Sequence, residues 1–208
     1  MLKSISCLNS PRTVDLHLLL ARHGEIDGNG ERYIGATDPP ISVRGQVQAS
    51  ALAETVLSFR PDCCFCSPML RTRQTAEIVL RPEACGINYL PELREVDFGL
   101  WEGLSFDEIQ ARYPELAADW ANKGVDFGFP EGEKIKDFWN RVRAAARLFT
   151  SGPEETVLII SHGGVIRALI CHFLGLEFDN YLLFNVRPGG LVTLEVSGQS
   201  GVLTGFNL

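Results

Sequence analysis

Short apolar runs alternate along this chain with segments whose apolar residues recur at helical spacing. Six runs are predicted to be strands, at residues 16–21, 63–66, 88–90, 157–160, 191–196 and 202–206. Helices are predicted between them, at about residues 43–59, 67–80, 135–149 and 165–174. This alternation favours a mostly parallel sheet with helices on both faces. We therefore expect one α/β domain, residues 1–208, with three α/β/α layers.

Capping residues set the expected starts of two of these helices. Ser42 is a typical N-cap for the first helix, and Pro61 lies just beyond its end. Ser67 and Pro68 are expected to open the second helix, because proline is tolerated at the first helical position.

Two segments fall outside the alternation of strands and helices. Residues 1–14 lack the continuous apolar core of a signal peptide, and we expect a leading tail there. Residues 101–132 hold two short helical patterns and a loop rich in glycine and phenylalanine. We expect this second segment to cover the carboxyl edge of the sheet as a lid or specificity wall, with a packed surface hairpin as the alternative.

The length, charge and amino-acid composition limit the classes of protein to which this chain can belong. A length of 208 residues with 45% hydrophobic residues fits one globular domain, and no apolar run is long enough to span a membrane. The net charge of -7 argues against a nucleic-acid-binding surface. Of the 19 basic residues 15 are arginine, a bias compatible with binding an oxyanion. We expect a cytoplasmic protein with neither nucleic-acid nor membrane partners.

Three of the six cysteines fall together at residues 63, 64 and 66. Successive strand residues point to opposite faces, and no second cluster of Cys and His completes a tetrahedral metal site. We interpret these cysteines as small buried apolar residues of a protein in a reducing compartment.

Two of the predicted strands end in a histidine followed by glycine. Residues 22–24 read Arg-His-Gly, and residues 161–164 read Ser-His-Gly-Gly. Open α/β sheets bind their ligands at the carboxyl ends of strands. A neutral imidazole there can attack phosphorus, and water can hydrolyse the resulting phosphohistidine. A lone histidine would more often be a capping or core residue, but the second motif favours His23 as a nucleophile.

Positive charge is expected around the bound phosphate. Arg22 directly precedes the nucleophile, and Arg71 falls in the first turn of the predicted helix, where the helix dipole adds to its field. His162 is expected to donate a hydrogen bond to a phosphoryl oxygen, and the backbone amides around Gly163 face the same point.

The leaving oxygen of a phosphate ester needs a proton. Four carboxylates follow the third predicted strand, namely Glu92, Glu95, Asp97 and Glu102. The acid among them must be held protonated near neutral pH, which an apolar or like-charged setting achieves. Spacing alone does not rank the four.

Together these motifs resemble the histidine phosphatase superfamily, which has the phosphoglycerate-mutase-like fold. The matching residues are Arg22-His23-Gly24-Glu25, Asn29, Gly35, Asp38-Pro39, Gly45, Gln48-Ala49, Ser67-Pro68, Arg71-Thr72, Gln74-Thr75-Ala76, Leu93, Glu95, Gly99, Glu102-Gly103 and Ser161-His162-Gly163-Gly164. The resemblance implies that His23 is phosphorylated and that Glu95 is the acid. It also implies a substrate pocket made by Arg22, Asn29, Gly35, Arg71, His162 and Gly163, without a metal or organic cofactor.

The residues after Glu95 bear on the branch of the family. Cofactor-dependent mutases usually carry Arg-His-Tyr there, whereas residues 96–98 read Val-Asp-Phe. Mutases also tend to have a hydroxyl residue before the glycine that corresponds to Gly35, where this chain has Ile34. The run 93–103 is similar to the α-ribazole phosphatase group of the cobalamin pathway and to the bisphosphatase domain acting on fructose-2,6-bisphosphate.

This resemblance implies a metal-independent phosphoric monoester hydrolase, with α-ribazole 5′-phosphate as the favoured small-molecule substrate. A phosphoglycerate mutase, a broad-specificity sugar phosphatase and a non-catalytic phospho-ligand-binding protein are the alternatives, and a homodimer is left open.

A few residues bear on substrate choice. Ile26 stands where the family commonly has Thr or Ser, and Lys134 stands where it usually has Ser. The aromatic residues Trp101, Phe127 and Phe129 have two interpretations, stacking on a heterocycle or packing in the core.

Overall fold

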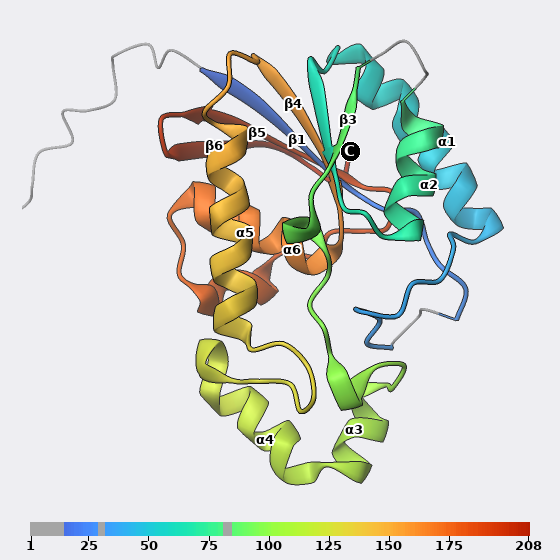
Figure 1. Cartoon of the computed structure of the whole chain (residues 1–208), viewed down its shortest axis with the longest axis vertical. Coiled ribbons are helices and arrows are strands. Elements are labelled where there is room, and N and C mark those ends of the chain that lie inside the picture. The colour runs from blue at the N-terminus through green and yellow to red at the C-terminus, as the bar shows by residue number, and fades with distance from the viewer. Residues whose placement is uncertain (1–14, 29–31, 81–84) are drawn as a thin grey trace, which may run out of the picture.

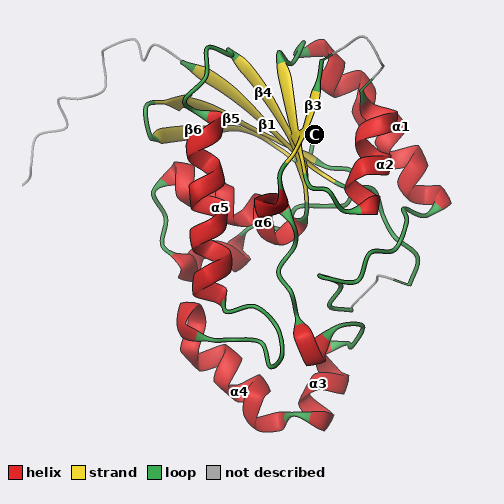
Figure 2. Cartoon of the chain, viewed as in Figure 1, coloured by secondary structure: helices red, strands yellow, loops and turns green. Residues whose placement is uncertain are grey.

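A six-stranded sheet runs through the centre of the computed structural model (Figures 1 and 2). The strands are Leu16–Arg22 (β1), Cys63–Cys66 (β2), Ile87–Tyr89 (β3), Thr156–Ser161 (β4), Leu191–Ser197 (β5) and Ser200–Phe206 (β6). Their order is β3-β2-β4-β1-β5-β6, with β1 to β4 parallel and β5 and β6 antiparallel to their neighbours. The six predicted strands and the mostly parallel sheet are thus confirmed.

The structure describes residues 15–28, 32–80 and 85–208, so the expected leading tail, residues 1–14, lies outside the described part. Within the described ranges, none of the helices combines the length and the apolar character needed to cross a bilayer.

Helices cover both faces of the sheet, which confirms the expected three layers. They are α1 (Val43–Ser58), α2 (Leu70–Val79), α5 (Ile135–Phe149) and α6 (Gly163–Leu174). Alternate residues of β1 face opposite layers: Leu19 and Ala21 pack in the cluster that includes α1 and α2, whereas Leu18 and Leu20 pack in the cluster that includes α5 and α6. Burial on both faces explains why residues 18–21 of β1 are all apolar.

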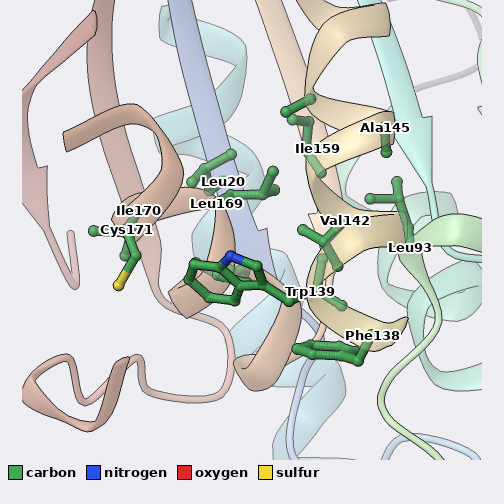
Figure 3. Close-up of a cluster of buried hydrophobic side chains, with 14 of the residues drawn as sticks. Leu20, Leu93, Phe138, Trp139, Val142, Ala145, Ile159, Leu169, Ile170 and Cys171 are labelled. Carbon is green, nitrogen blue, oxygen red and sulfur yellow. The ribbon is translucent and has the colours of Figure 1, made fainter. Parts of the chain in front are cut away.

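The larger of the two core clusters lies between the sheet, α5 and α6 (Figure 3). The apolar stripe that predicted α5 is buried along the whole helix, at Ile135, Phe138, Trp139, Val142, Ala146 and Phe149. In Figure 3 this stripe meets Leu20 of β1, Ile159 of β4 and Leu169 of α6. The helical period in the sequence thus reflects the face that α5 buries.

The start of α2 differs from the prediction. The helix begins at Leu70 and not at Ser67-Pro68, because the Asp38 carboxylate accepts the Leu70 N–H at 2.8 and 2.9 Å. A side chain from a distant loop therefore supplies the cap. Ser42 does cap α1, since its hydroxyl oxygen accepts the Gly45 N–H at 3.0 Å.

The segment at residues 99–126 lies beyond the sheet, at the lower end of Figure 1. It contains η2 (Gly99–Trp101), α3 (Phe106–Arg112), α4 (Pro114–Lys123) and η3 (Gly124–Asp126). Ser105 and Glu108 form a capping box that starts α3. Trp101 and Phe127 are buried core residues, so core packing is the correct interpretation for these two rings.

Two short 3-10 helices complete the described elements that bear on the site. They are η1 (Pro91–Leu93), which follows β3, and η4 (Phe178–Leu183), which follows α6.

We predict that Leu158→Ala lowers the free energy of unfolding by about 2–5 kcal/mol, because it removes a fully buried side chain of β4 and leaves a cavity. Urea denaturation measures the loss. Leu148→Ala, on the exposed side of α5, makes the same chemical change and should stay within about 0.5 kcal/mol. Equal losses in the two variants would contradict the described core.

Candidate active site

The parallel pairing of β1 with β4 brings the two histidine motifs together. Arg22 lies opposite Ser161 in the strand register, so His23 and His162 follow neighbouring strands at one edge of the sheet. Both side chains are buried, and their ring centroids are 5.2 Å apart. The chain also reverses its direction of winding between these two strands, which is the usual ligand-binding point of an open α/β sheet.

His23 has a lone pair available on one ring nitrogen. Its Nδ1 lies 2.7 Å from the carbonyl oxygen of Gly24. Because a carbonyl oxygen can only accept, Nδ1 must carry the hydrogen, and Nε2 then holds the lone pair of the neutral ring. Burial lowers the pKa of His23 well below its usual value, and the charges of Arg22 and Arg71 lower this pKa further. The imidazole is therefore neutral and nucleophilic at neutral pH.

Arg71 is a buried positive charge that makes three hydrogen bonds at the site. Its Nη1 donates to the carbonyl oxygen of Thr37 at 2.8 Å and its Nη2 to that of Gly35 at 2.9 Å. Its Nε donates to Nδ1 of His162 at 3.2 Å. Asp38 lies 3.5 Å from Nη1, but the three hydrogen-bond acceptors are neutral. The guanidinium therefore keeps most of its positive charge for an incoming anion.

Arg22 supplies a second buried positive charge. Its Nη1 donates to the carbonyl oxygen of Val186 at 2.6 Å, while its buried Nε has no hydrogen-bond partner among the described residues. Burial lowers the pKa of this guanidinium, and Glu95 opposes the shift. An arginine side chain still stays charged in a protein. Its unpartnered N–H is a ready donor to a phosphoryl oxygen.

His162 has both of its ring nitrogens engaged. Nδ1 accepts from Arg71, so Nε2 carries the hydrogen and donates to the Ser67 hydroxyl at 2.8 Å. Burial lowers its pKa well below the usual value, with Arg71 the next largest cause. The expected donation from His162 to a phosphoryl oxygen would require one of these bonds to break. In this structure His162 holds Arg71 in place.

Glu95 is the one of the four candidate carboxylates that lines the same pocket as His23. Its Oε2 accepts the Gly164 N–H at 2.9 Å, at the positive N-terminal end of α6, so its setting is positive and not the apolar or like-charged one expected for the acid. A side chain at Gly164 would overlap Oε1 of Glu95 and come within 2.8 Å of the Tyr181 hydroxyl. Glycine is therefore needed for the carboxylate to approach the helix end this closely.

Glu102 has a different task. Its carboxylate accepts the backbone N–H groups of Gly35 at 3.0 Å and Ala36 at 2.7 Å, and the Thr37 hydroxyl at 2.8 Å. These bonds hold the loop whose carbonyl oxygens accept from Arg71. Asp97 accepts the N–H of Gly99 at 2.9 Å and likewise supports a turn.

The structure brings most of the predicted site residues together in one pocket of about 490 Å³. Those that line it are Arg22, His23, Arg71, Glu95 and Gly163. Gly35 and His162 are not among the lining residues, but each accepts a hydrogen bond from Arg71. Asn29 is outside the described residues.

The outer wall of this pocket contains residues that the sequence did not single out. They include Arg32, Tyr33, Trp120, Arg167, Phe178 and Tyr181. Arg167 donates from Nε to the carbonyl oxygen of Phe184 at 2.7 Å, and its guanidinium carbon lies 5.6 Å from the Tyr181 ring centre. Arg167 follows Gly163 by about one helical turn, so its spacing was a usable signal.

The cysteines of β2 belong to the core. Cys64 and Cys66 are fully buried on the face that α1 and α2 cover, whereas Cys63 points to the other face. Burial raises the pKa of the Cys66 thiol to about 12. Among the residues that the structure describes, no cluster of three or more His, Cys, Asp or Glu is placed to hold a metal ion.

Known relatives resemble the chain in sequence along most of its length. Phosphoserine phosphatase 1 of Hydrogenobacter thermophilus is 29% identical over 92% of both chains. A probable phosphoglycerate mutase, GpmB of Citrobacter koseri, is 32% identical over 77% of this chain and 76% of its own.

Solved structures agree with this likeness. The crystal structure of the alpha-ribazole phosphatase from Shigella flexneri superposes with a TM-score of 0.84 and 29% identity, and covers 93% of this chain and 96% of its own.

A family model confirms the resemblance that the motifs predict. The description of this family is the histidine phosphatase superfamily (branch 1), and its model matches residues 18–208. The expectation of a phosphatase hydrolase is confirmed as well. With its two histidine motifs on adjacent strands and a match along nearly the whole chain, this protein belongs to branch 1 of the histidine phosphatase superfamily.

Proposed function

We propose that this phosphatase hydrolyses a phosphate monoester through a covalent phosphohistidine on His23. The observation that carries the proposal is the hydrogen bond from Nδ1 to the Gly24 carbonyl, which leaves the lone pair on Nε2. This nitrogen belongs to a neutral ring in a pocket that Arg22 and Arg71 also line. A nucleophile and two positive charges are the groups that phosphoryl transfer needs.

In the first step, Nε2 of His23 forms a bond to phosphorus as the bond to the ester oxygen breaks. Arg22 and Arg71 neutralise charge on the non-bridging oxygens. Glu95, which lines the same pocket, gives its proton to the departing oxygen. The alcohol leaves, and the phosphoryl group stays on the imidazole.

In the second step, water attacks phosphorus and the bond to Nε2 breaks. The Glu95 carboxylate takes a proton from the attacking water, which restores the acid for the next cycle. Inorganic phosphate then leaves the pocket. Side chains and water carry out every proton and phosphoryl transfer in these two steps, so the proposed enzyme is metal-independent.

The favoured substrate is α-ribazole 5′-phosphate, in which a ribose carries an aromatic base. Two observations support it. A structural neighbour is named alpha-ribazole phosphatase, and the pocket has aromatic side chains at Trp120, Phe129, Phe178 and Tyr181. Such rings can stack on a planar heterocycle. This substrate would place the enzyme in cobalamin biosynthesis in the cytoplasm.

Relatives named phosphoserine phosphatase and phosphoglycerate mutase make a small phosphorylated acid the second candidate substrate. A mutase would return the phosphoryl group to a sugar acid, and a sugar phosphatase would accept many esters. The Val-Asp-Phe sequence at residues 96–98 favours hydrolysis over mutase activity, because mutases of the family usually have Arg-His-Tyr there. A protein that only binds phospho-ligands would not need a carboxylic acid beside the leaving group.

His23→Ala should abolish turnover, because no other group in the proposal forms the covalent intermediate. Rapid quenching followed by mass spectrometry should find an acid-labile phosphate on His23 in the wild-type protein, with activity undiminished in excess EDTA. His17→Ala, which removes an exposed histidine from the strand that precedes His23, is the matched control and should retain activity. Full turnover by His23→Ala would exclude the proposed mechanism.

Glu95→Gln should slow alkyl phosphates by about 10²–10⁴-fold, the usual contribution of general acid catalysis. It should slow p-nitrophenyl phosphate much less, because nitrophenolate leaves almost without a proton. Steady-state kcat on both substrates measures the difference. If the variant loses the same factor on both, the acid is another group.

A substrate panel tests the preference for a heterocycle. It contains α-ribazole 5′-phosphate, phosphoserine, nucleotides, sugar phosphates, and 3-phosphoglycerate with a bisphosphate primer. We expect α-ribazole 5′-phosphate to have the highest kcat/KM, and Trp120→Ala to lower that value by about tenfold through lost stacking. Phosphoserine is the internal control, since it has no ring to stack. Isomerised phosphoglycerate would identify a mutase instead.

A further inference from the structure

The backbone around Glu95 has no regular structure of its own to hold it. Glu95 lies between η1, which ends at Leu93, and η2, which begins at Gly99. Strands and helices fix their residues through repeated backbone bonds, and this segment has none of these ladders. Its position therefore depends on contacts from other elements.

Arg141 of α5 supplies those contacts. Its Nη1 donates to the carbonyl oxygens of Glu92 at 2.6 Å and Arg94 at 2.7 Å. Its Nη2 donates to the carbonyl oxygen of Glu95 itself at 3.1 Å. One guanidinium thus binds three carbonyl oxygens within four consecutive residues.

Glu133 holds that guanidinium in turn. Its two carboxylate oxygens accept from Nε of Arg141 at 2.7 Å and from Nη2 at 2.8 Å, which makes a bidentate ion pair. Both side chains are largely buried, with exposed fractions of 22% and 19%. The N–H of Glu133 also donates to the carbonyl oxygen of Asp97 at 2.9 Å, on the other side of Glu95. The Arg141–Glu133 pair therefore holds the acid segment on both sides of Glu95.

The backbone and the carboxylate of Glu95 are held by different groups. Arg141 contacts the backbone of Glu95, whereas the Glu95 carboxylate is held at the other end by the Gly164 N–H. The guanidinium carbon of Arg141 also lies 4.9 Å from the ring centre of Phe138, which lines the pocket. The buried apolar stripe of α5 fixes this helix against the core. Because Arg141 belongs to α5, its hydrogen bonds fix the irregular segment around Glu95 relative to the helix.

We propose that Arg141, held by Glu133, is a positioning residue that sets the Glu95 carboxyl within reach of the leaving oxygen. This inference rests on the proposed function, in which Glu95 is the acid. It predicts that loss of Arg141 impairs proton donation more than it impairs phosphate binding or attack by His23. A purely structural role would instead slow all substrates alike.

Two substrates of almost the same shape separate these cases. Phenyl phosphate has a poor leaving group that needs a proton, whereas p-nitrophenyl phosphate has a good one. Arg141→Met should lower kcat on phenyl phosphate by about 10²-fold, the scale of general acid catalysis, and change kcat on p-nitrophenyl phosphate far less. KM should change little for either ester.

Matched variants control for charge and folding. Arg143→Met removes an exposed arginine from the same helix and should leave both rates unchanged. Arg141→Lys keeps a positive charge and an alkyl stem but loses the planar donors. It should show the same selective loss on phenyl phosphate, and it serves as the test if Arg141→Met does not fold. Glu133→Gln should act in the same direction with a smaller effect, because it weakens the ion pair but keeps an acceptor.

The double variant Arg141→Met/Glu95→Gln gives the sharpest result. If Arg141 acts through Glu95, the double variant hydrolyses phenyl phosphate no more slowly than Glu95→Gln alone. Multiplied losses in the double variant, or equal slowing of both esters by Arg141→Met and Arg141→Lys, would overturn the inference. If Glu95→Gln itself shows no dependence on the leaving group, the proposed acid is wrong. If it does and the Arg141 variants do not, only the positioning role fails.

Discussion

The parallel pairing of β1 with β4 is the constraint on which the site depends. Two apolar strands buried on both faces hold one register, and that register places Arg22 beside Ser161. The next residue of each strand is a histidine, and His23 and His162 therefore meet at the carboxyl edge of the sheet. A shift of one residue in either strand would turn its apolar side chains toward the wrong layer, so core packing protects the geometry of the chemistry.

Around this edge, the buried charges are held mainly by backbone oxygens. Arg71 is bonded to two carbonyl oxygens and an imidazole, and Arg141 to three carbonyl oxygens and a carboxylate. Burying a guanidinium is costly unless its donors are satisfied. The hydrogen-bond acceptors of Arg71 are neutral, and the one carboxylate paired with it, Asp38, is 3.5 Å away, which suits a group proposed to attract phosphate. Arg141 has a full counter-charge in Glu133, which suits a group that only supports.

Much of the fold, and several of the side chains that line the pocket, could be predicted from the sequence because both rest on local patterns. An apolar run ending in Arg-His-Gly indicates a strand and its ligand-binding end together, and the stripe at residues 135–149 defines α5. Properties that depend on contacts between residues far apart in the chain could not be predicted from the sequence. The start of α2 depends on Asp38, and the hydrogen on each ring of His23 and His162 depends on which groups the fold places beside it. The pocket wall depends on how segments far apart in the chain fold over the sheet edge.

The outer wall of the pocket and the groups proposed for chemistry come from different segments of the chain. The groups proposed for chemistry end or follow β1, begin α2 or follow η1, whereas much of the outer surface of the pocket comes from α4 and η4. Trp120 and Tyr181 belong to these outer segments and contribute nothing to the strand pairing. Mutations in these segments can change which alcohol part of the phosphate ester fits the pocket, while the residues at the carboxyl edge of the sheet stay unchanged. Substrate preference and phosphoryl chemistry are therefore set by different parts of the chain.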